Sequence, residues 1–196
     1  MRSHTIILAD PGYGGPSLAY NISSTISDKV LWFSSENPKV AENIAKSYGK
    51  RIRLDVINSR RINIANLNEI NIQLSRYLET VRDVPAICLT LVSELILIHG
   101  LEKVYLFLSN LINKVEAKRG TVISLVIRGA QQRRDEILIS RLFANVFTLH
   151  GEYENEVRKF VLESDGPIND RFLFELQSEG YRIDLPPDVE KFIKGL

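Results

Sequence analysis

The sequence predicts an α/β protein with a mostly parallel central sheet flanked by helices. Short apolar runs, typical of buried strands, alternate with longer segments in which apolar residues recur at helical spacing. The first strand, residues 4–8, leads through a glycine-rich loop into a helix. Beyond residue 151 the alternation ends and strand-like segments follow one another, which predicts antiparallel C-terminal strands.

We expect a single domain over residues 1–196, with a core at about 4–150 and an antiparallel extension at about 151–196. A chain of 196 residues can bury a sizeable core, and its 44% hydrophobic and 25% charged residues are typical of soluble globular proteins. Its one cysteine, Cys88, excludes an intramolecular disulfide and a cysteine-based zinc site, which favours a cytoplasmic location. We expect no signal peptide and no membrane segment, because the longest apolar stretch, 85–99, is too short to span.

The first two helices have clear sequence signals. Leu18, Ile22 and Ile26 recur at four-residue spacing and predict a helix from residue 18 onward. After a strand at 29–34, either Ser35 or Asn37 can cap a helix that runs to about residue 48.

The later elements follow the same alternation. A strand at 51–57 alternates apolar and polar residues, which predicts either one wetter face or an edge position. Lys118-Arg119-Gly120 predicts a helix end. The remaining predicted elements are a helix at 67–81, a strand at 86–92, a helix at 101–117, a strand at 121–127, a helix at 131–143, strands at 145–149, 156–163 and 171–176, an edge strand at 181–185 and a short helix or tail at 187–196, with a turn at 164–167.

The loop at residues 9–17 has the setting of a phosphate-binding P-loop, between a strand and a helix N-terminus. A working P-loop carries Gly-Lys-Ser/Thr, whose lysine binds the β- and γ-phosphates and whose hydroxyl binds magnesium. Here residues 14–17 read Gly-Gly-Pro-Ser, so the lysine is missing and Pro16 removes a backbone donor. The loop is either a tight turn or a weak, vestigial nucleotide site. Its candidate binding residues are Gly12, Tyr13, Gly14, Gly15 and Ser17.

Asp10 stands at the start of this loop, where a carboxylate would repel a phosphate. We expect Asp10 to cap the helix instead.

This loop resembles the Gly-x-Pro-Gly-x-Gly-Lys-Thr loop of the KaiC-like and RadA-like ATPases of the RecA superfamily. Residues 9–14 match its first part and 15–17 depart from it, and the segment order is similar over residues 4–163. In that family a strand ends in a catalytic glutamate, matched here by Glu36, and the Walker B strand ends in an aspartate, where this chain has Thr90. The resemblance implies a RecA-like P-loop NTPase fold in which ATP hydrolysis is lost, with neither ATP nor magnesium expected as a cofactor.

Two carboxylates remain candidates at this end of the sheet. Glu36 is either a remnant of the water-activating group or a solvated residue before a helix. Glu94 could contact a ligand at the carboxyl edge of the sheet. We expect no metal site, because His4, His99 and His150 lack ligand-like spacing.

Basic residues suggest surfaces for nucleic acid or for a protein partner, although the net charge is only +1. Each is either a contact or part of a solvated segment. The candidates are Arg60, Arg61, Arg128, Arg133 and Arg134.

The sequence therefore predicts a non-catalytic pseudo-ATPase that acts by binding, in recombination, repair or signalling. Its partner would be an active RecA/RadA/KaiC-like paralogue, a second copy in a homo-oligomer, or DNA or RNA. The alternative is a nucleotide-binding ATPase or switch with an altered P-loop.

Overall fold

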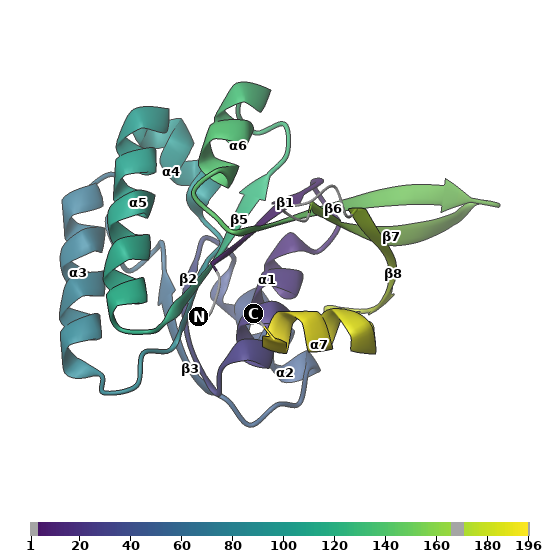
Figure 1. Cartoon of the computed structure of the whole chain (residues 1–196), viewed down its shortest axis with the longest axis horizontal. Coiled ribbons are helices and arrows are strands. Elements are labelled where there is room, and N and C mark those ends of the chain that lie inside the picture. The colour runs from purple at the N-terminus through teal and green to yellow at the C-terminus, as the bar shows by residue number, and fades with distance from the viewer. Residues whose placement is uncertain (1–3, 166–170, 196) are drawn as a thin grey trace.

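A computed structural model describes residues 4–165 and 171–195, and it has a nine-stranded sheet in the order β3-β2-β4-β5-β1-β6-β7-β8-β9 (Figure 1). Strands β1 to β6 pair in parallel, and β7 to β9 continue the sheet in antiparallel pairing. The strands are β1 (Thr5–Ala9), β2 (Lys29–Ser34), β3 (Arg53–Asn58), β4 (Ala86–Leu89), β5 (Thr121–Ile127), β6 (Asn145–Glu154), β7 (Val157–Asp165), β8 (Arg171–Glu179) and β9 (Arg182–Asp184). The predicted α/β class, with a mostly parallel sheet and antiparallel C-terminal strands, is confirmed.

Helices cover both faces of the sheet. Helices α1, α2 and α7 lie on one face, and α3, α4, α5 and α6 lie on the other (Figure 1). The helices are α1 (Gly15–Ile26), α2 (Pro38–Ser47), α3 (Leu67–Thr80), α4 (Val92–His99), α5 (Leu101–Ala117), α6 (Arg133–Ser140) and α7 (Pro187–Gly195).

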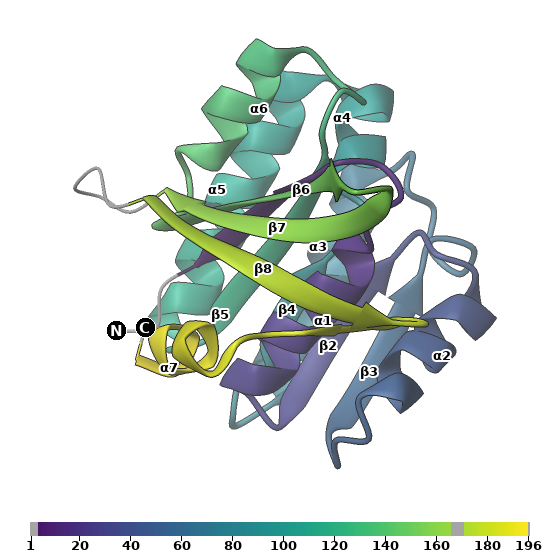
Figure 2. The same cartoon turned by 90° about the vertical axis from the view of Figure 1, so that its right-hand side faces the viewer.

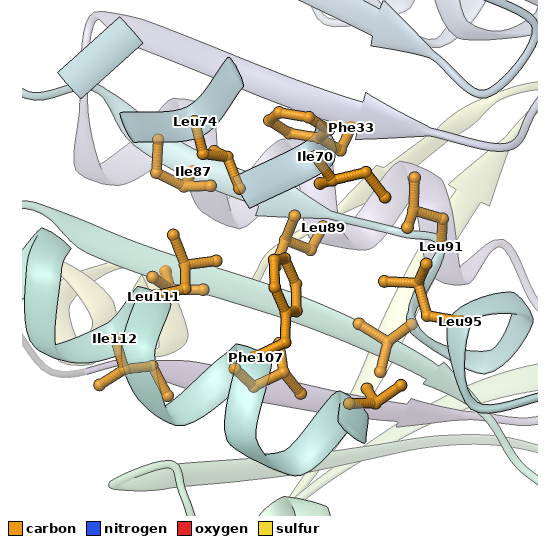
Figure 3. Packing of buried hydrophobic residues seen from close by; sticks show 14 of the residues in the cluster. Phe33, Ile70, Leu74, Ile87, Leu89, Leu91, Leu95, Phe107, Leu111 and Ile112 are labelled. Carbon is orange, nitrogen blue, oxygen red and sulfur yellow. The ribbon is translucent and has the colours of Figure 1, made fainter. Parts of the chain in front are cut away.

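Each face of the sheet has its own hydrophobic core, because successive residues of a strand point to opposite faces. In β2, Leu31 and Phe33 pack under α3 and α5, whereas Val30 and Trp32 pack under α1 and α2. The core under α3 and α5 is seen closely in Figure 3; its labelled residues are Phe33, Ile70, Leu74, Ile87, Leu89, Leu91, Leu95, Phe107, Leu111 and Ile112.

Local signals set several element ends as expected. The side chain of Asn37 accepts a hydrogen bond from the N–H of Lys39 and caps α2. The helix is followed by Gly49 in the left-handed conformation, with φ of 60°. Strand β3 lies at the sheet edge, one of the two alternatives that its alternating pattern predicts.

Several predicted boundaries are wrong. Helix α6 ends at Ser140 rather than at residue 143, and β8 continues to Glu179 rather than ending at residue 176. Helix α1 begins at Gly15 rather than at residue 18, because Pro16 fits its first turn. Strand β4 ends at Leu89, and the apolar residues from Val92 onward form α4, a helix that the sequence analysis missed. A short apolar run does not distinguish a buried strand from a buried helix, because every side of either element can be apolar when it is fully buried. Strand β6 continues to Glu154, well past residue 149.

The C-terminal extension turns back over α1. Figure 2 shows β8 crossing in front of α1 toward α2, and the chain then returns through β9 to α7. Val189 and Ile193 of α7 are buried in the same core as α1. The predicted edge strand is confirmed, and of the two alternatives for the last segment, a short helix or a tail, the structure has a helix. The predicted turn at 164–167 is wrong at Ser164 and Asp165, which belong to β7, and its remaining residues lie outside the described ones.

Candidate functional site: the glycine-rich loop and its surroundings

The loop after β1 has the backbone shape that its glycines predict. Gly12 and Gly14 adopt φ values of 80° and 75°, which L side chains rarely adopt, and Gly14 is the N-cap of α1. Gly15 packs closely, because a Cβ there would lie 2.9 Å from the Cβ of Ala9 and 2.9 Å from Leu125 Cδ1. The loop therefore passes from strand to helix through a turn that tolerates few other residues.

Tyr13 fixes the loop to the β6–β7 hairpin. Its ring occupies the space beside Gly151, where a Cβ would lie 1.7 Å from Tyr13 Cε1. The guanidinium of Arg158 lies 3.8 Å from the Tyr13 ring centroid and donates a hydrogen bond to the Gly12 carbonyl at 2.5 Å. Phe160 meets the same ring edge-on, with centroids 5.5 Å apart. The hairpin thus contacts the loop at Gly12 and Tyr13, while Pro11 and Gly12 stay exposed.

Ser17, a candidate binding residue in the first turn of α1, is buried and takes part in internal hydrogen bonds. Its Oγ lies 2.6 Å from the Tyr48 hydroxyl and also donates to the backbone carbonyl of Tyr181. The N–H of Ile183 donates to the same Tyr48 hydroxyl at 2.9 Å. Burial raises the pKa of Tyr48, so this phenol stays protonated at neutral pH.

The segment around Tyr181 and Ile183 packs against the first turns of α1. A Cβ on Gly14 would lie 2.5 Å from Ile183 Cδ1. Asn21, one turn further along α1, donates a hydrogen bond to the Ile183 carbonyl at 2.8 Å. The chain's own C-terminal segment therefore contacts the helix end at which a phosphate would lie. We call Ser17, Tyr48, Tyr181 and Ile183 the plug contacts.

Asp10 does not cap α1, so that prediction is wrong. Its carboxylate forms an ion pair with Arg128, with 2.9 Å between Nη1 and Oδ1. Helix α1 has no side-chain cap at its N-cap residue, Gly14. Because β1 and β5 are adjacent and parallel, the residues that follow them lie side by side, and opposite charges at that point attract.

Thr90, where the resemblance places a Walker B aspartate, is part of the core. Its hydroxyl accepts a hydrogen bond from the indole N–H of Trp32 at 2.9 Å and donates to the Phe33 carbonyl at 3.2 Å. The Thr90 hydroxyl therefore acts as both acceptor and donor toward residues of β2, and the residue is buried. It therefore links β4 to β2.

The structure brings Glu36 and Glu94 to the same carboxyl end of the sheet. Burial, with a further contribution from the nearby Glu94 charge, raises the pKa of Glu36. Ser35 donates a hydrogen bond to Glu94 Oε1 at 2.6 Å. Glu94 Oε2 is buried and has no hydrogen-bond partner within the described residues.

In residues 4–165 and 171–195 no group of three or more His, Cys, Asp or Glu side chains is placed to hold a metal ion.

The basic candidates fall into two separate groups. Arg60 and Arg61 are exposed after β3, at the sheet edge, and Arg133 and Arg134 are exposed at the start of α6, after β5. Three strand intervals separate β3 from β5, which corresponds to roughly 14 Å at about 4.8 Å per interval. Arg128 is paired with Asp10 and belongs to the loop instead.

Sequence reasoning named Ser17 but missed the other plug contacts, Tyr48, Tyr181 and Ile183, and it missed Arg158. Tyr181 lies 164 residues from Ser17, and no local pattern connects them. One signal was available, since a glycine inside the β-rich segment, Gly151, suggests close approach by another group. That group is Tyr13.

Comparisons with known proteins do not assign this chain to a family. No protein-family model matches the chain, and a search of curated proteins finds no match. Within the part of the chain that the structure describes, none of the helices combines the length and apolar character that crossing a membrane requires.

Proposed function

We propose that this chain is a RecA-like, KaiC/RadA-related protein that has lost ATP hydrolysis and acts by binding a partner. The observation that carries the proposal is the hydrogen bonding of Ser17 to Tyr48 and to the Tyr181 carbonyl. To bind magnesium, the Ser17 hydroxyl would have to give up its hydrogen bonds to Tyr48 and to the Tyr181 carbonyl. Each buried group left without a partner would cost about 1–3 kcal/mol.

Two further features support the same proposal. Thr90 cannot supply the carboxylate that positions magnesium, and its hydroxyl is engaged by Trp32 and Phe33. The lysine that would neutralise the β- and γ-phosphates is absent from residues 14–17, which read Gly-Gly-Pro-Ser. With the metal anchor and the cation both missing, the transferred phosphoryl group has no charge stabilisation, although the strand–loop–helix scaffold is retained.

The test is nucleotide binding and turnover by the full chain. We expect calorimetry with ATP and saturating magnesium to give no measurable binding heat, and phosphate release to stay at the level of buffer. Glu36→Gln is the matched variant, because Glu36 occupies the position of the water-activating carboxylate. Turnover by the wild-type chain that disappears in Glu36→Gln would reject the proposal and favour an ATPase with an altered P-loop.

A second candidate, nucleic-acid binding, is favoured by the exposure of Arg60, Arg61, Arg133 and Arg134. It predicts binding to single-stranded DNA or RNA that weakens steeply with salt, because phosphate contacts release counterions. Arg133→Ala with Arg134→Ala would weaken this binding, whereas Arg76→Ala with Arg82→Ala, two exposed arginines elsewhere, would not. Binding that does not change with salt, or no binding at all, rejects this candidate.

A further inference from the structure

A groove of about 1170 Å³ lies at the edge of the sheet where β2, β4 and β5 begin. Its walls are the three segments that lead into these strands, residues 26–29, 82–84 and 116–120. The three strands are parallel neighbours, so their first residues share one edge of the sheet. The glycine-rich loop follows the last residue of β1, which pairs in parallel with β5, and it therefore lies at the opposite edge. We call this hollow the strand-start groove.

Two walls of the groove are held together by close packing. A Cβ on Gly120 would lie 2.5 Å from Val84 Cγ1 and 2.7 Å from Val115 Cγ1, so a larger residue would displace its neighbours. The segment before β5 therefore passes directly against the segment before β4. Arg119 and Arg82, which belong to these two segments, line the same groove as a result.

Arg119 adopts a backbone conformation that arginine rarely takes. Its φ is 59°, in the left-handed position after the end of α5 that is usually occupied by glycine. Here the glycine is the next residue, Gly120, where packing requires it. The exposed Arg119 guanidinium is in no ion pair with the described residues. Residues held in such conformations concentrate at functional sites, which points to a role for this side chain in binding.

The groove carries charges of both signs. Lys29 and Asp83 of its lining form an ion pair, with 3.2 Å between Nζ and Oδ2. The remaining charged side chains of the lining, which form no ion pair with the described residues, are Arg82, Lys118 and Arg119 against Asp28 and Glu116. Lys118 also donates a hydrogen bond to the Leu78 carbonyl. The excess of one positive charge is complemented by a ligand that carries two acidic groups and one ammonium group.

The helix ends at the groove separate the places for these groups. Helix α1 ends at Ile26, and its last carbonyls attract a cation. Asp28 follows two residues later, so an ammonium group is favoured on this side, whereas Arg82 and Arg119 lie before β4 and β5. Two strand intervals separate β2 from β5, roughly 10 Å at about 4.8 Å per interval. An extended residue covers about 3.5 Å, so a short peptide fits this span better than a single amino acid.

Two buried polar groups at this edge have no hydrogen-bond partner within the described residues. They are Nε2 of His4, which precedes β1, and Oγ1 of Thr121, the first residue of β5. His4 Nδ1 accepts a hydrogen bond from the Val122 N–H at 3.0 Å, and burial lowers the pKa of His4, so the neutral ring carries its proton on Nε2. The charge of Glu116 opposes this shift, because Glu116 lies near the ring. Buried groups without a protein partner are satisfied by ordered water or by a ligand.

We propose that the strand-start groove binds a short acidic peptide, a zwitterion with one more negative than positive charge. Its two carboxylates contact Arg82 and Arg119, and its ammonium group contacts Asp28 beside the end of α1. The site is separate from the glycine-rich loop and does not rest on the function proposed above. Its test therefore uses the full chain without nucleotide.

Calorimetry with the dipeptide Ala-Glu tests the charge pattern of the ligand. We expect saturable binding at one site per chain, with a Kd on the order of 0.1–1 mM. N-acetyl-Ala-Glu lacks the ammonium group and Ala-Gln lacks one carboxylate, so each should bind about tenfold more weakly. Absence of saturable heat with Ala-Glu overturns the proposal, and so does inorganic phosphate that binds as tightly as the dipeptide.

Arg119→Gly separates a binding role from a structural one. The variant should bind Ala-Glu about tenfold more weakly, because a charge-assisted contact is lost. Its urea midpoint should not fall, since glycine adopts positive φ without strain. Arg76→Gln is the matched control, because Arg76 is exposed on α3 and does not line the groove, and its affinity should be unchanged. Unchanged affinity in Arg119→Gly would contradict the proposal.

Asp28→Asn tests the place of the ammonium group. It should weaken binding of Ala-Glu about fivefold or more and leave N-acetyl-Ala-Glu unaffected, because only the first peptide has an ammonium group to lose its partner. Glu42→Gln, an exposed carboxylate on α2, should change neither affinity. Equal losses for both peptides in Asp28→Asn would contradict this orientation.

Amide NMR spectra locate the site without any substitution. Addition of Ala-Glu should shift the signals of Val84 and Gly120 in the walls of the groove, and those of residues 12–17 should stay in place. Shifts confined to residues 12–17 would overturn the strand-start groove as the site. Because ATP binding and turnover are measured at that loop, failure of this inference is distinguishable from failure of the proposed function.

Discussion

The first turns of α1 and the hollow that Leu101, Tyr105, Leu106 and Leu138 of α5 and α6 line differ in what contacts them. At α1, the Ser17 hydroxyl is hydrogen-bonded to Tyr48 and to the Tyr181 carbonyl of the same chain. The side chain of Ile183 fills the space beside Gly14. In the hollow, Leu106 and Leu138 remain exposed. In one region the Ser17 hydroxyl is hydrogen-bonded within the chain, whereas the other keeps apolar surface exposed. This difference favours a chain that acts through its surfaces rather than through a nucleotide.

Introducing an aspartate distinguishes a buried position, Thr90 after β4, most strongly from the exposed surface at Leu138. Thr90→Asp places a carboxylate in the core beside Trp32, and we expect the free energy of unfolding to fall by about 3 kcal/mol or more. Leu138→Asp, on the exposed surface, should change it by only about 0.5 kcal/mol. Urea unfolding monitored by tryptophan fluorescence measures both. A Thr90→Asp chain of wild-type stability that gains magnesium binding would mean that the Walker B position still faces a ligand.

Gly151 tests whether Tyr13 really fixes the loop to the hairpin. Gly151→Ala places a methyl group in the volume of the Tyr13 ring, and we expect a loss of about 1–3 kcal/mol from overpacking. The same substitution in a Tyr13→Ala background should cost much less, because the clash is then absent. A double-mutant cycle by chemical denaturation gives this coupling. Additive effects of the two changes would show that the ring does not lie there.

Removing one hydroxyl tests the plug contacts. Tyr48→Phe deprives Ser17 and the N–H of Ile183 of a shared partner within a buried site, and should cost about 1–2 kcal/mol. Tyr77→Phe is the control, because its hydroxyl bonds Asp55 at a partly exposed position and should cost less. Equal losses in the two variants, measured as shifts of the urea midpoint, would argue against a buried plug.

The smallest expected effect concerns pH. The pKa of Glu36 is raised in the folded protein, so the native state binds a proton more tightly than the unfolded chain does. Stability from this group is therefore lost as pH rises from the unfolded value of 4.5 through the folded pKa. Glu36→Gln should remove this loss and stabilise the protein at pH 7 by less than about 1 kcal/mol. Thermal melts at pH 4 and pH 7, with exposed Glu42→Gln as control, would detect no gain if Glu36 were freely solvated.

Local patterns predicted much of the fold because they report local physics. The spacing of Leu18, Ile22 and Ile26 and the cap at Asn37 need only neighbouring residues to act. The same patterns failed at Val92, where a buried helix and a buried strand look alike.

The surroundings of the loop could not be predicted in the same way. The contact of Ser17 with Tyr181 depends on how β8 and β9 fold back over α1, which is a tertiary property. The sequence shows Asp10 only as a residue that precedes a helix, and it therefore predicts a helix cap. Its actual partner, Arg128, is 118 residues away and is brought near by the pairing of β1 with β5. Charge pairs between distant segments leave no periodic signal in a sequence.

The most direct measurement is amide hydrogen exchange across residues 12–17, with and without saturating magnesium and ATP. If the plug contacts hold the first turn of α1, exchange at these amides should be the same in both samples. Exchange that slows selectively across this loop when nucleotide is added would show a phosphate bound there and would contradict the account.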